Sequence, residues 1–440
     1  MNPVHPVVAS ESIPADLSRS AGPFERLIRR CCAAAVAVVC LLICWHVMMR
    51  LGQVSLASPI GIYTIVVSTY VVSRFALSTV YRPPPDAGYE PMVAIVVPAY
   101  NEGEAVSRTI HSCLSLEYPP EKIEVVVIND GSTDDTWDQM LIAVDQHPPG
   151  SVRCIDLGSN QGKRAAMAAG IRATSAEILL FVDSDSMPAP NALARLVQAF
   201  DDERVGAACG ITHVRNAYTN ALTKMQAARY YVSFQLLKTA ESVFGAVSCC
   251  PGCFAAYRRE AILPLLADWE HQRFLGVECT YGDDRALTNS LLRAGWRSLY
   301  DSTAEAYTDA PDAYRKFFRQ QLRWKKSWSR EGPRLASHLW RTRPLAFPSV
   351  LVATLAGVAS PVVMAWNLVV HPWATGIAPV LYVVALYLIA GAYGLFLRSQ
   401  KNNRLWLWAI VGTFFYIAFS FQIVWAIARI RDGAWGTRDT

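Results

Sequence analysis

Two pairs of closely spaced carboxylates in this 440-residue chain could do metal and proton chemistry. The first pair, Asp183 and Asp185, directly follows the apolar segment ILLFV at 178–182. Acids one residue apart at the end of a strand can offer oxygens to a hard cation, and Mg²⁺ or Mn²⁺ is typically shared between such carboxylates and substrate phosphates. The structural alternative is a turn in which an Asp caps the following helix. Pro188 and Pro190, which come next, are consistent with such a turn.

The second pair, Asp283 and Asp284, lies within the segment YGDDR at 281–285. Repulsion between adjacent carboxylates can raise one pKa and so favours a general base. A solvated helix cap is the structural alternative. Asp130, in the segment NDGSTDD at 129–135, is a further candidate, although Asp-Gly-Ser-Thr is also ordinary turn chemistry.

The stretch 314–330 (YRKFFRQQLRWKKSWSR) combines many cations with aromatic residues and contains no acid. On a helix, one broad stripe would contain Tyr314, Phe317, Gln321, Trp324 and Trp328. This composition is typical of an interfacial helix, with aromatics at the headgroup level and cations near anionic lipid. Because the stretch lies between the acidic motifs and an apolar C-terminal region, Arg323 could instead offer its planar fork to a phosphate.

Apolar, β-branched segments precede the polar motifs and predict the strands that position them. These segments are residues 92–97, 123–128, 153–157 and 177–182. Helical patterns alternate with them, so the sequence predicts a largely parallel α/β sheet. Ligands of such sheets bind at the C-terminal strand ends, where the polar motifs fall. No glycine-rich phosphate loop follows the first strand, so acids and a metal would have to hold any nucleotide.

Hydrophobic residues make up 52% of the chain and charged residues only 18%, and this deficit is local. The runs without Asp, Glu, Lys or Arg are 31–49, 51–73, 344–397 and 405–428. A bilayer span needs about 20 apolar residues. The first two runs therefore predict one span each, and the third predicts two spans with a break near His371, Pro372 and Gly376. The fourth predicts one span or a broken pair.

Basic residues beside these runs predict the orientation. They are Arg26, Arg29, Arg30, Arg398, Lys401 and Arg404. They place the N-terminus and the region from about 83 to 343 in the cytoplasm. In that reducing compartment the eleven cysteines are expected to be thiols. Cys249, Cys250 and Cys253 have no second pair at metal-binding spacing, so buried thiols are expected there. The net charge of +5 does not indicate nucleic-acid binding.

Taken together, the motifs closely resemble those of processive family 2 glycosyltransferases, which include hyaluronan, chitin and cellulose synthases. The motifs are PAYNE at 98–102, NDGS at 129–132, GKR at 162–164, DSD at 183–185, GDDR at 282–285 and QxxRW at 320–324. The resemblance extends from about residue 92 to the C-terminus. It is strongest to hyaluronan synthases, whose pattern also includes the motif WGTR at 435–438. However, CCPGCF at 249–254 replaces the expected Ser/Thr-Gly-Pro-Leu and is nearer to nodulation-type chitin-oligosaccharide synthases, which leaves the product open.

This resemblance implies roles for individual residues. The UDP side would comprise Tyr100, Glu102, Asp130, Lys163, Asp183, Arg323, Trp435 and Arg438. Asp185, helped by Asp183, would hold Mg²⁺ or Mn²⁺ on the diphosphate. Asp284, beside Asp283, would be the base for the acceptor hydroxyl. Trp324 would stack on the acceptor sugar, and Gln320 would shape that site.

The implied fold is a GT-A-type α/β domain, mostly parallel, inserted between transmembrane helices and accompanied by interfacial amphipathic helices. The expected division is a tail at 1–30, two transmembrane helices at 31–81, the transferase domain at 82–312, interfacial helices at 313–343, a C-terminal transmembrane region at 344–428 and a tail at 429–440. The protein would lie in the plasma or inner membrane with its catalytic domain in the cytoplasm. Three C-terminal spans would leave residues 435–438 on the extracellular side of the membrane, away from the donor. A broken pair at 405–428 would instead return the chain to the cytoplasm.

The expected reaction is inverting polymerisation of UDP-GlcNAc and UDP-glucuronate into hyaluronan, with export through the membrane helices. The donors, the growing chain and membrane lipid would be the partners. The main alternative is a chitin or chitin-oligosaccharide synthase that uses UDP-GlcNAc alone. A non-processive lipid glycosyltransferase would share the acidic motifs. An inactive receptor or transport component with a degenerate domain is the alternative from a different class.

Overall fold

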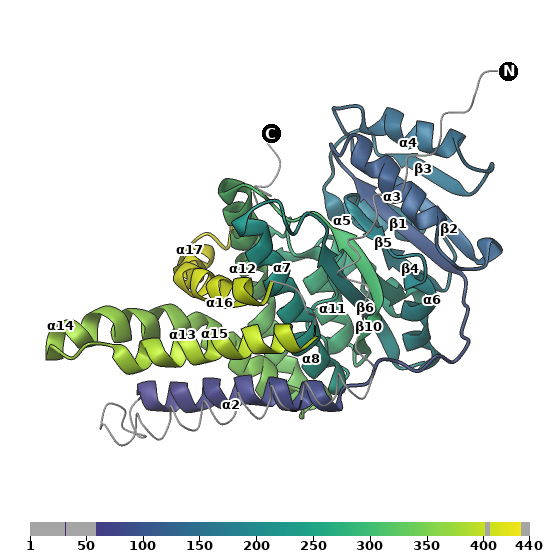
Figure 1. The fold of residues 1–440 in the computed structure, drawn as a ribbon. Helices are drawn as coiled ribbons and strands as arrows, with labels where there is room; N and C mark the ends of the chain where they lie inside the picture. The colour runs from purple at the N-terminus through teal and green to yellow at the C-terminus, as the bar shows by residue number, and fades with distance from the viewer. Residues whose placement is uncertain (1–30, 32–58, 401–404, 433–440) are drawn as a thin grey trace.

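The computed structural model describes residue 31, residues 59–400 and residues 405–432 (Figure 1). The predicted first span, except Cys31, lies outside this part of the chain, as do Trp435 and Arg438. An α/β domain occupies one end of the molecule, and long helices extend from it side by side (Figure 1).

An eight-stranded sheet forms the centre of the domain, in the order β3-β2-β1-β4-β7-β6-β10-β5. Its parallel strands are β1 (Val93–Ala99), β2 (Ile123–Asn129), β3 (Val152–Asp156), β4 (Ile178–Phe181), β6 (Val205–Val214) and β10 (Arg297–Thr308). Two antiparallel strands, β7 (Ala255–Arg258) and β5 (Ser186–Pro188), complete it. The predicted mostly parallel sheet is therefore confirmed.

Alternate residues of β1 enter two different cores. Val93, Ile95 and Val97 contact the layer built from α3 (Glu104–Leu114), α4 (Thr136–Asp145) and α6 (Ala192–Leu196). Ala94 and Val96 face the other layer, with α5 (Lys163–Arg172) and α11 (Asp283–Arg293). Helices cover both faces, which is why the strands are continuously apolar.

The remaining short elements connect these layers. They are η2 (Pro120–Lys122), η3 (Val197–Asp201), α9 (Arg259–Ile262), η5 (Leu263–Leu265), α10 (Leu266–Glu270) and the small hairpin β8 (Arg273–Phe274) and β9 (Val277–Glu278). A helical segment made of α7 (Ala221–Val232), the π-helix η4 (Ser233–Lys238) and α8 (Thr239–Val243) contacts the membrane-type helices.

Four described helices are long and apolar enough to cross a membrane. The first is α2 (Pro59–Val80), and the third is α15 (Val380–Gln400). The second is one continuous helix made of α13 (Phe347–Ala365), η6 (Trp366–Val370) and α14 (His371–Thr375). The fourth is made of α16 (Leu405–Ala418), η7 (Phe419–Phe421) and α17 (Gln422–Ala428). The predicted break in run 344–397 falls at Gly376, whose φ of +67° only glycine adopts easily.

The last of these helices bends back toward the α/β domain. Leu405 packs with Val214 and Ala310 of the domain. After the turn at η7, the Ile430 carbonyl accepts a 2.6 Å hydrogen bond from the Tyr281 hydroxyl. Both ends of run 405–428 therefore contact the same domain, as a broken pair would require, and the chain reaches residue 432 on the domain's side.

The aromatic stripe of 314–330 lies on α12 (Tyr314–Thr342) and contacts protein. Phe317 is fully buried, with its ring 5.5 Å from that of Phe415 on α16. Trp328 lies so close to Gly357 on α13 that a Cβ there would come within 2.4 Å of its ring. These contacts fix α12 between the domain and the membrane-type helices.

Candidate active site

The predicted nucleotide residues gather at one edge of the sheet. Tyr100 follows β1, Asp130 follows β2, and Asp183 lies just beyond β4. The register pairs Ala99 with Asn129, so the ends of β1 and β2 are level. The three residues therefore come from neighbouring strand ends, where parallel sheets bind ligands.

Asp130 organises the loop that precedes α5. Its buried carboxylate accepts hydrogen bonds from the backbone N–H groups of Gln161 (2.7 Å) and Gly162 (3.0 Å). Gly131 has a φ of +67°, and a Cβ there would lie 2.3 Å from the Ser159 carbonyl carbon. This close approach of two loops brings Lys163, the first residue of α5, to the site.

Two cations reach Asp183 from different elements. The Lys163 ammonium forms an ion pair with its carboxylate. Burial alone would raise the pKa of Asp183, but the charges of Lys163 and Arg323 outweigh that effect and hold the pKa below its ordinary value. Arg323 comes from α12, so this helix contributes charge to the same site as the strand ends.

Asp185 lies among like charges. Burial, followed by the negative charges of Asp183 and Glu102, raises its pKa to about 7. A cation would relieve this crowding. In the described part of the chain, no group of three Asp, Glu, His or Cys side chains could hold a metal by itself. The arrangement therefore fits an ion that takes one or two carboxylates here and its other oxygens from substrate, as Mg²⁺ and Mn²⁺ do.

The adjacent acids at the start of α11 have different surroundings. Asp283 is buried, and its carboxylate accepts a 2.5 Å hydrogen bond from Arg164 Nε. This ion pair occupies both groups, so Arg164 faces Asp283 and not the open site. Asp284 is partly exposed and accepts a hydrogen bond from the Cys249 thiol at 3.6 Å. Of the two adjacent acids, Asp284 is therefore the one that Arg164 does not hold, and it stays the predicted base.

Gln320, Arg323 and Trp324 share one turn of α12. Trp324 is 40% exposed, and its ring centroid lies 6.3 Å from that of Tyr230 on α7. Gln320 Oε1 is buried and has no hydrogen-bond partner among the described residues. An exposed indole beside an unsatisfied acceptor suits a sugar, which offers both an apolar face and hydroxyl donors.

A close contact docks this helix against the Gly282 turn. Arg330 donates a 2.8 Å hydrogen bond to the Tyr281 carbonyl, and Gly282 has a φ of +73°. A Cβ on Gly282 would lie 2.1 Å from Ser327 Oγ. The contact sets the distance between Asp284 and the residues of α12.

Gly282→Ala is expected to disrupt this docking, through both the clash and the positive φ. We expect it to lower the melting temperature and to abolish donor turnover. Gly276→Ala is the matched control, because Gly276 has a φ of +80° but nothing within 4 Å of its Cβ position. A single strained φ costs on the order of 1–2 kcal/mol. Equal losses of stability and turnover in the two variants would contradict the docking argument.

The end of the described chain is tied to the same region. Lys326 is buried, and its ammonium donates a 2.9 Å hydrogen bond to the Asp432 carbonyl. Trp435 and Arg438 follow a few residues later but lie outside the described residues, so their roles remain predictions.

Some contacts of the site could not be predicted from the sequence. Tyr230 had no motif to mark it as a neighbour of Trp324. Cys249, Cys250 and Cys253 were predicted as buried thiols, which is correct only for Cys250. Cys249 and Cys253 are half-buried because they lie at the site, where Cys249 contacts Asp284 and Cys253 contacts Asp183. The only indication in the sequence was that both cysteines lie in segment 249–254, which differs from the hyaluronan synthase pattern.

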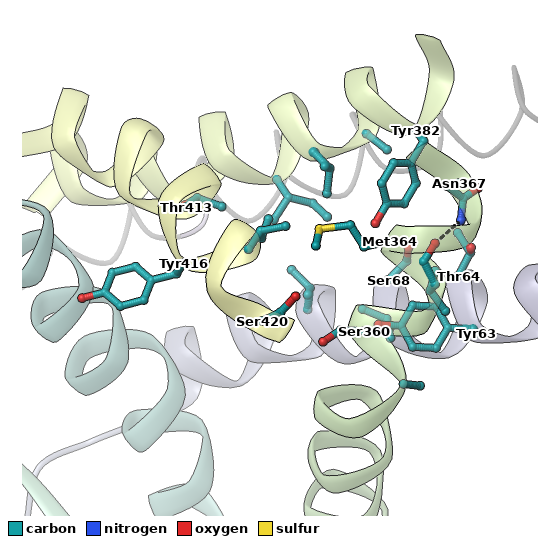
Figure 2. Close-up of a pocket in the computed structure, with 18 of the residues that line it drawn as sticks. Tyr63, Thr64, Ser68, Ser360, Met364, Asn367, Tyr382, Thr413, Tyr416 and Ser420 are labelled. Atoms are coloured by element: carbon teal, nitrogen blue, oxygen red, sulfur yellow. Dashed lines mark hydrogen bonds between the residues drawn. The ribbon is translucent and has the colours of Figure 1, made fainter. Parts of the chain in front are cut away.

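A cavity of ≈ 1360 Å³ lies between α2, α7, α13, α15 and α16. Apolar side chains predominate in its lining, together with hydroxyl and amide groups such as Tyr63, Ser68, Asn367 and Tyr382 (Figure 2). Residues of α7 line it immediately before Tyr230 in the chain. The cavity therefore lies next to the helix that contacts Trp324.

The largely parallel sheet, the acids at its strand ends and the flanking apolar helices define a membrane-associated glycosyltransferase domain of GT-A type. The profile of "Glycosyl transferase family 2" matches residues 94–265. The chain therefore contains a family 2 glycosyltransferase domain at residues 94–265.

Similar proteins agree with this assignment. The chain is 37% identical to hyaluronan synthase of Streptococcus pyogenes over 278 residues, which cover 62% of the chain and 66% of that enzyme. It is 35% identical to an N-acetylglucosaminyltransferase of Mesorhizobium japonicum over 288 residues, covering 60% of the chain and 66% of that protein. The match thus spans just under two thirds of each relative.

A solved structure shares the fold. A mannosyltransferase from Pyrobaculum calidifontis, in complex with GDP-Man and Mn²⁺, superimposes with a TM-score of 0.61. The match covers 84% of this chain and 98% of that one, at 20% sequence identity.

Proposed function

We propose that this protein is a processive, inverting membrane glycosyltransferase that makes hyaluronan from UDP-GlcNAc and UDP-glucuronate and exports it. One observation carries the proposal: α12 places Arg323 near Asp183 and exposes Trp324 beside α7, which lines the membrane cavity. A donor site, an acceptor platform and an exit route would thus be contiguous. The similarity to a hyaluronan synthase supports the choice of product.

On the donor side, Tyr100, Glu102 and Asp130 would contact the nucleotide. Asp185 and Asp183 would hold Mg²⁺ or Mn²⁺, which supplies positive charge to the leaving diphosphate. The Mn²⁺ in the mannosyltransferase of the same fold supports this assignment. Lys163 and Arg323 would add further charge, and Trp435 and Arg438 would complete the site from the tail.

On the acceptor side, Asp284 would take the proton from the attacking hydroxyl. The acceptor oxygen then bonds to C1 of the donor sugar as the bond from C1 to the UDP oxygen breaks on the opposite face. This displacement inverts the anomeric centre and gives a β-linkage. Asp283, through Arg164, would position α11, while Trp324 and Gln320 would hold the acceptor sugar.

The membrane arrangement would suit export. Basic residues beside the apolar runs would keep the domain in the cytoplasm, where UDP-sugars are made, and the polymer would leave through the cavity. The return of run 405–428 to the domain would bring Trp435 and Arg438 to the cytoplasmic side, near the donor site.

Chitin synthesis is the second candidate, because segment 249–254 and the N-acetylglucosaminyltransferase relative favour it. Purified protein would be supplied with UDP-GlcNAc alone and with both donors, and the products digested with hyaluronan lyase or chitinase. We expect long, lyase-sensitive polymer only with both donors. Chitinase-sensitive polymer from UDP-GlcNAc alone would refute hyaluronan as the product. No metal-dependent UDP release under any condition would instead indicate an inactive receptor or transport component.

A further inference from the structure

The membrane cavity contains one permanently charged side chain. Arg229 lines it, and no Asp or Glu does so among the described residues. An arginine keeps its charge in any protein environment. A charged group that lines a cavity between apolar helices commonly marks the path of a substrate or ion. This cation therefore needs an explanation that the apolar lining does not give.

Arg229 lies at the end of the cavity nearest the acceptor site. The next residue, Tyr230, contacts Trp324, with 6.3 Å between ring centroids. The Arg229 guanidinium lies 5.5 Å from the centre of the Tyr416 ring. Figure 2 shows Tyr416 at one end of the cavity and Tyr63, Asn367 and Tyr382 toward the other. A glycan leaving Trp324 would thus meet Arg229 first.

The charge of Arg229 has no acid paired with it among the described residues. In the part of the chain that the structure describes, no carboxylate forms an ion pair with Arg229, whose side chain is exposed to the cavity. The nearby Lys325 adds a second cation, but its ammonium is occupied by the Phe419 carbonyl (2.6 Å) and Gln422 Oε1 (3.2 Å). Burial, followed by the charge of Arg229, lowers the pKa of Lys325 to about 8. The cavity mouth therefore favours anions.

We propose that Arg229 binds the carboxylates of an anionic glycan as it enters the cavity, and so selects a uronate-containing polymer over a neutral one. This inference rests on the proposed function and assigns its specificity to a residue outside the transfer site. A guanidinium binds a carboxylate through charge-assisted hydrogen bonds, which are stronger than neutral ones. An alternating polymer would offer one at every second sugar, whereas a neutral glycan would leave the cation without a partner.

Binding of matched oligosaccharides to the purified full-length protein tests the proposal. The probes are a hyaluronan hexasaccharide and chitohexaose, of equal length but different charge. Arg229→Gln should weaken binding of the anionic probe by about tenfold, the usual worth of a hydrogen bond to a charged group. Its affinity for chitohexaose should change less than twofold, and Arg229→Lys should retain most of the preference for the anionic probe.

Lys224→Gln is the matched control. Lys224 also lies on α7 and also contacts an aromatic ring of α16, Trp408, at 5.4 Å, but it does not line the cavity. The Lys224→Gln variant should bind both oligosaccharides with unchanged affinity. Equal losses for the two probes in Arg229→Gln, or no loss for either, would overturn the proposal. The binding measurement needs no turnover, so its outcome is independent of the proposed function. The role of Arg229 can be refuted while polymer synthesis is observed, and it can be confirmed even if the product is not hyaluronan.

Discussion

Asp185→Asn is expected to abolish glycosyl transfer, and excess EDTA should do the same to the wild-type protein. The carboxylate would hold the metal that offsets the diphosphate charge, and an amide is a much weaker ligand for a hard cation. Transfer would be measured as UDP release and as polymer formed from both donors. Addition of Mg²⁺ or Mn²⁺ should restore the EDTA-treated wild type but not the variant.

A loss of folding would look different from a loss of metal. Asp185 lies near the like charges of Asp183 and Glu102, so a neutral side chain removes a charge that the metal-free protein tolerates poorly. The melting temperature of metal-free Asp185→Asn should therefore equal or exceed that of the wild type. Asp145→Asn, at the exposed end of α4, serves as the control and should retain activity. Full polymer synthesis in excess EDTA would exclude the metal assignment.

Arg323→Ala should lower the synthesis rate by about 100- to 1,000-fold, the typical cost of losing a contact to developing negative charge. Trp324→Ala should also inactivate the enzyme, because it removes the acceptor platform, while donor binding survives in part. Rates would be measured at saturating donor and normalised to membrane-inserted protein.

Two exposed cations of the same helix, Arg315 and Lys316, provide the controls. If α12 only anchored the domain to lipid, each cation would contribute about 1 kcal/mol and all four variants would show similar, modest losses. If Arg323 acts on the diphosphate, Arg315→Ala and Lys316→Ala should cost little. Lys326 is unsuitable as a control because it is buried against Asp432.

The sequence by itself determined strands β1 to β4 and the apolar helices of the described chain, whereas β5, β6, β7 and β10 were not predicted. Continuous apolar, β-branched segments predicted β1 to β4 to within a few residues, because strands buried on both faces tolerate few polar side chains. Runs without charge marked the membrane-type helices, because a bilayer excludes charge over about 20 residues. The motifs at the strand ends placed Asp130, Asp183 and Asp185 at one edge of the sheet, since parallel strands end on the same side.

The tertiary structure decided which polar groups face each other. Asp283 and Asp284 are adjacent acids, and nothing in the sequence predicted different surroundings for them. Arg164, from another helix, pairs with Asp283 and not with Asp284. For run 405–428 the sequence left open one span or a broken pair, and the structure decided for the bend at η7. The position of Arg229 in the cavity could not be predicted at all. Periodicity reports which face of one element is apolar, but a charged partner or a cavity arises only where separate elements dock.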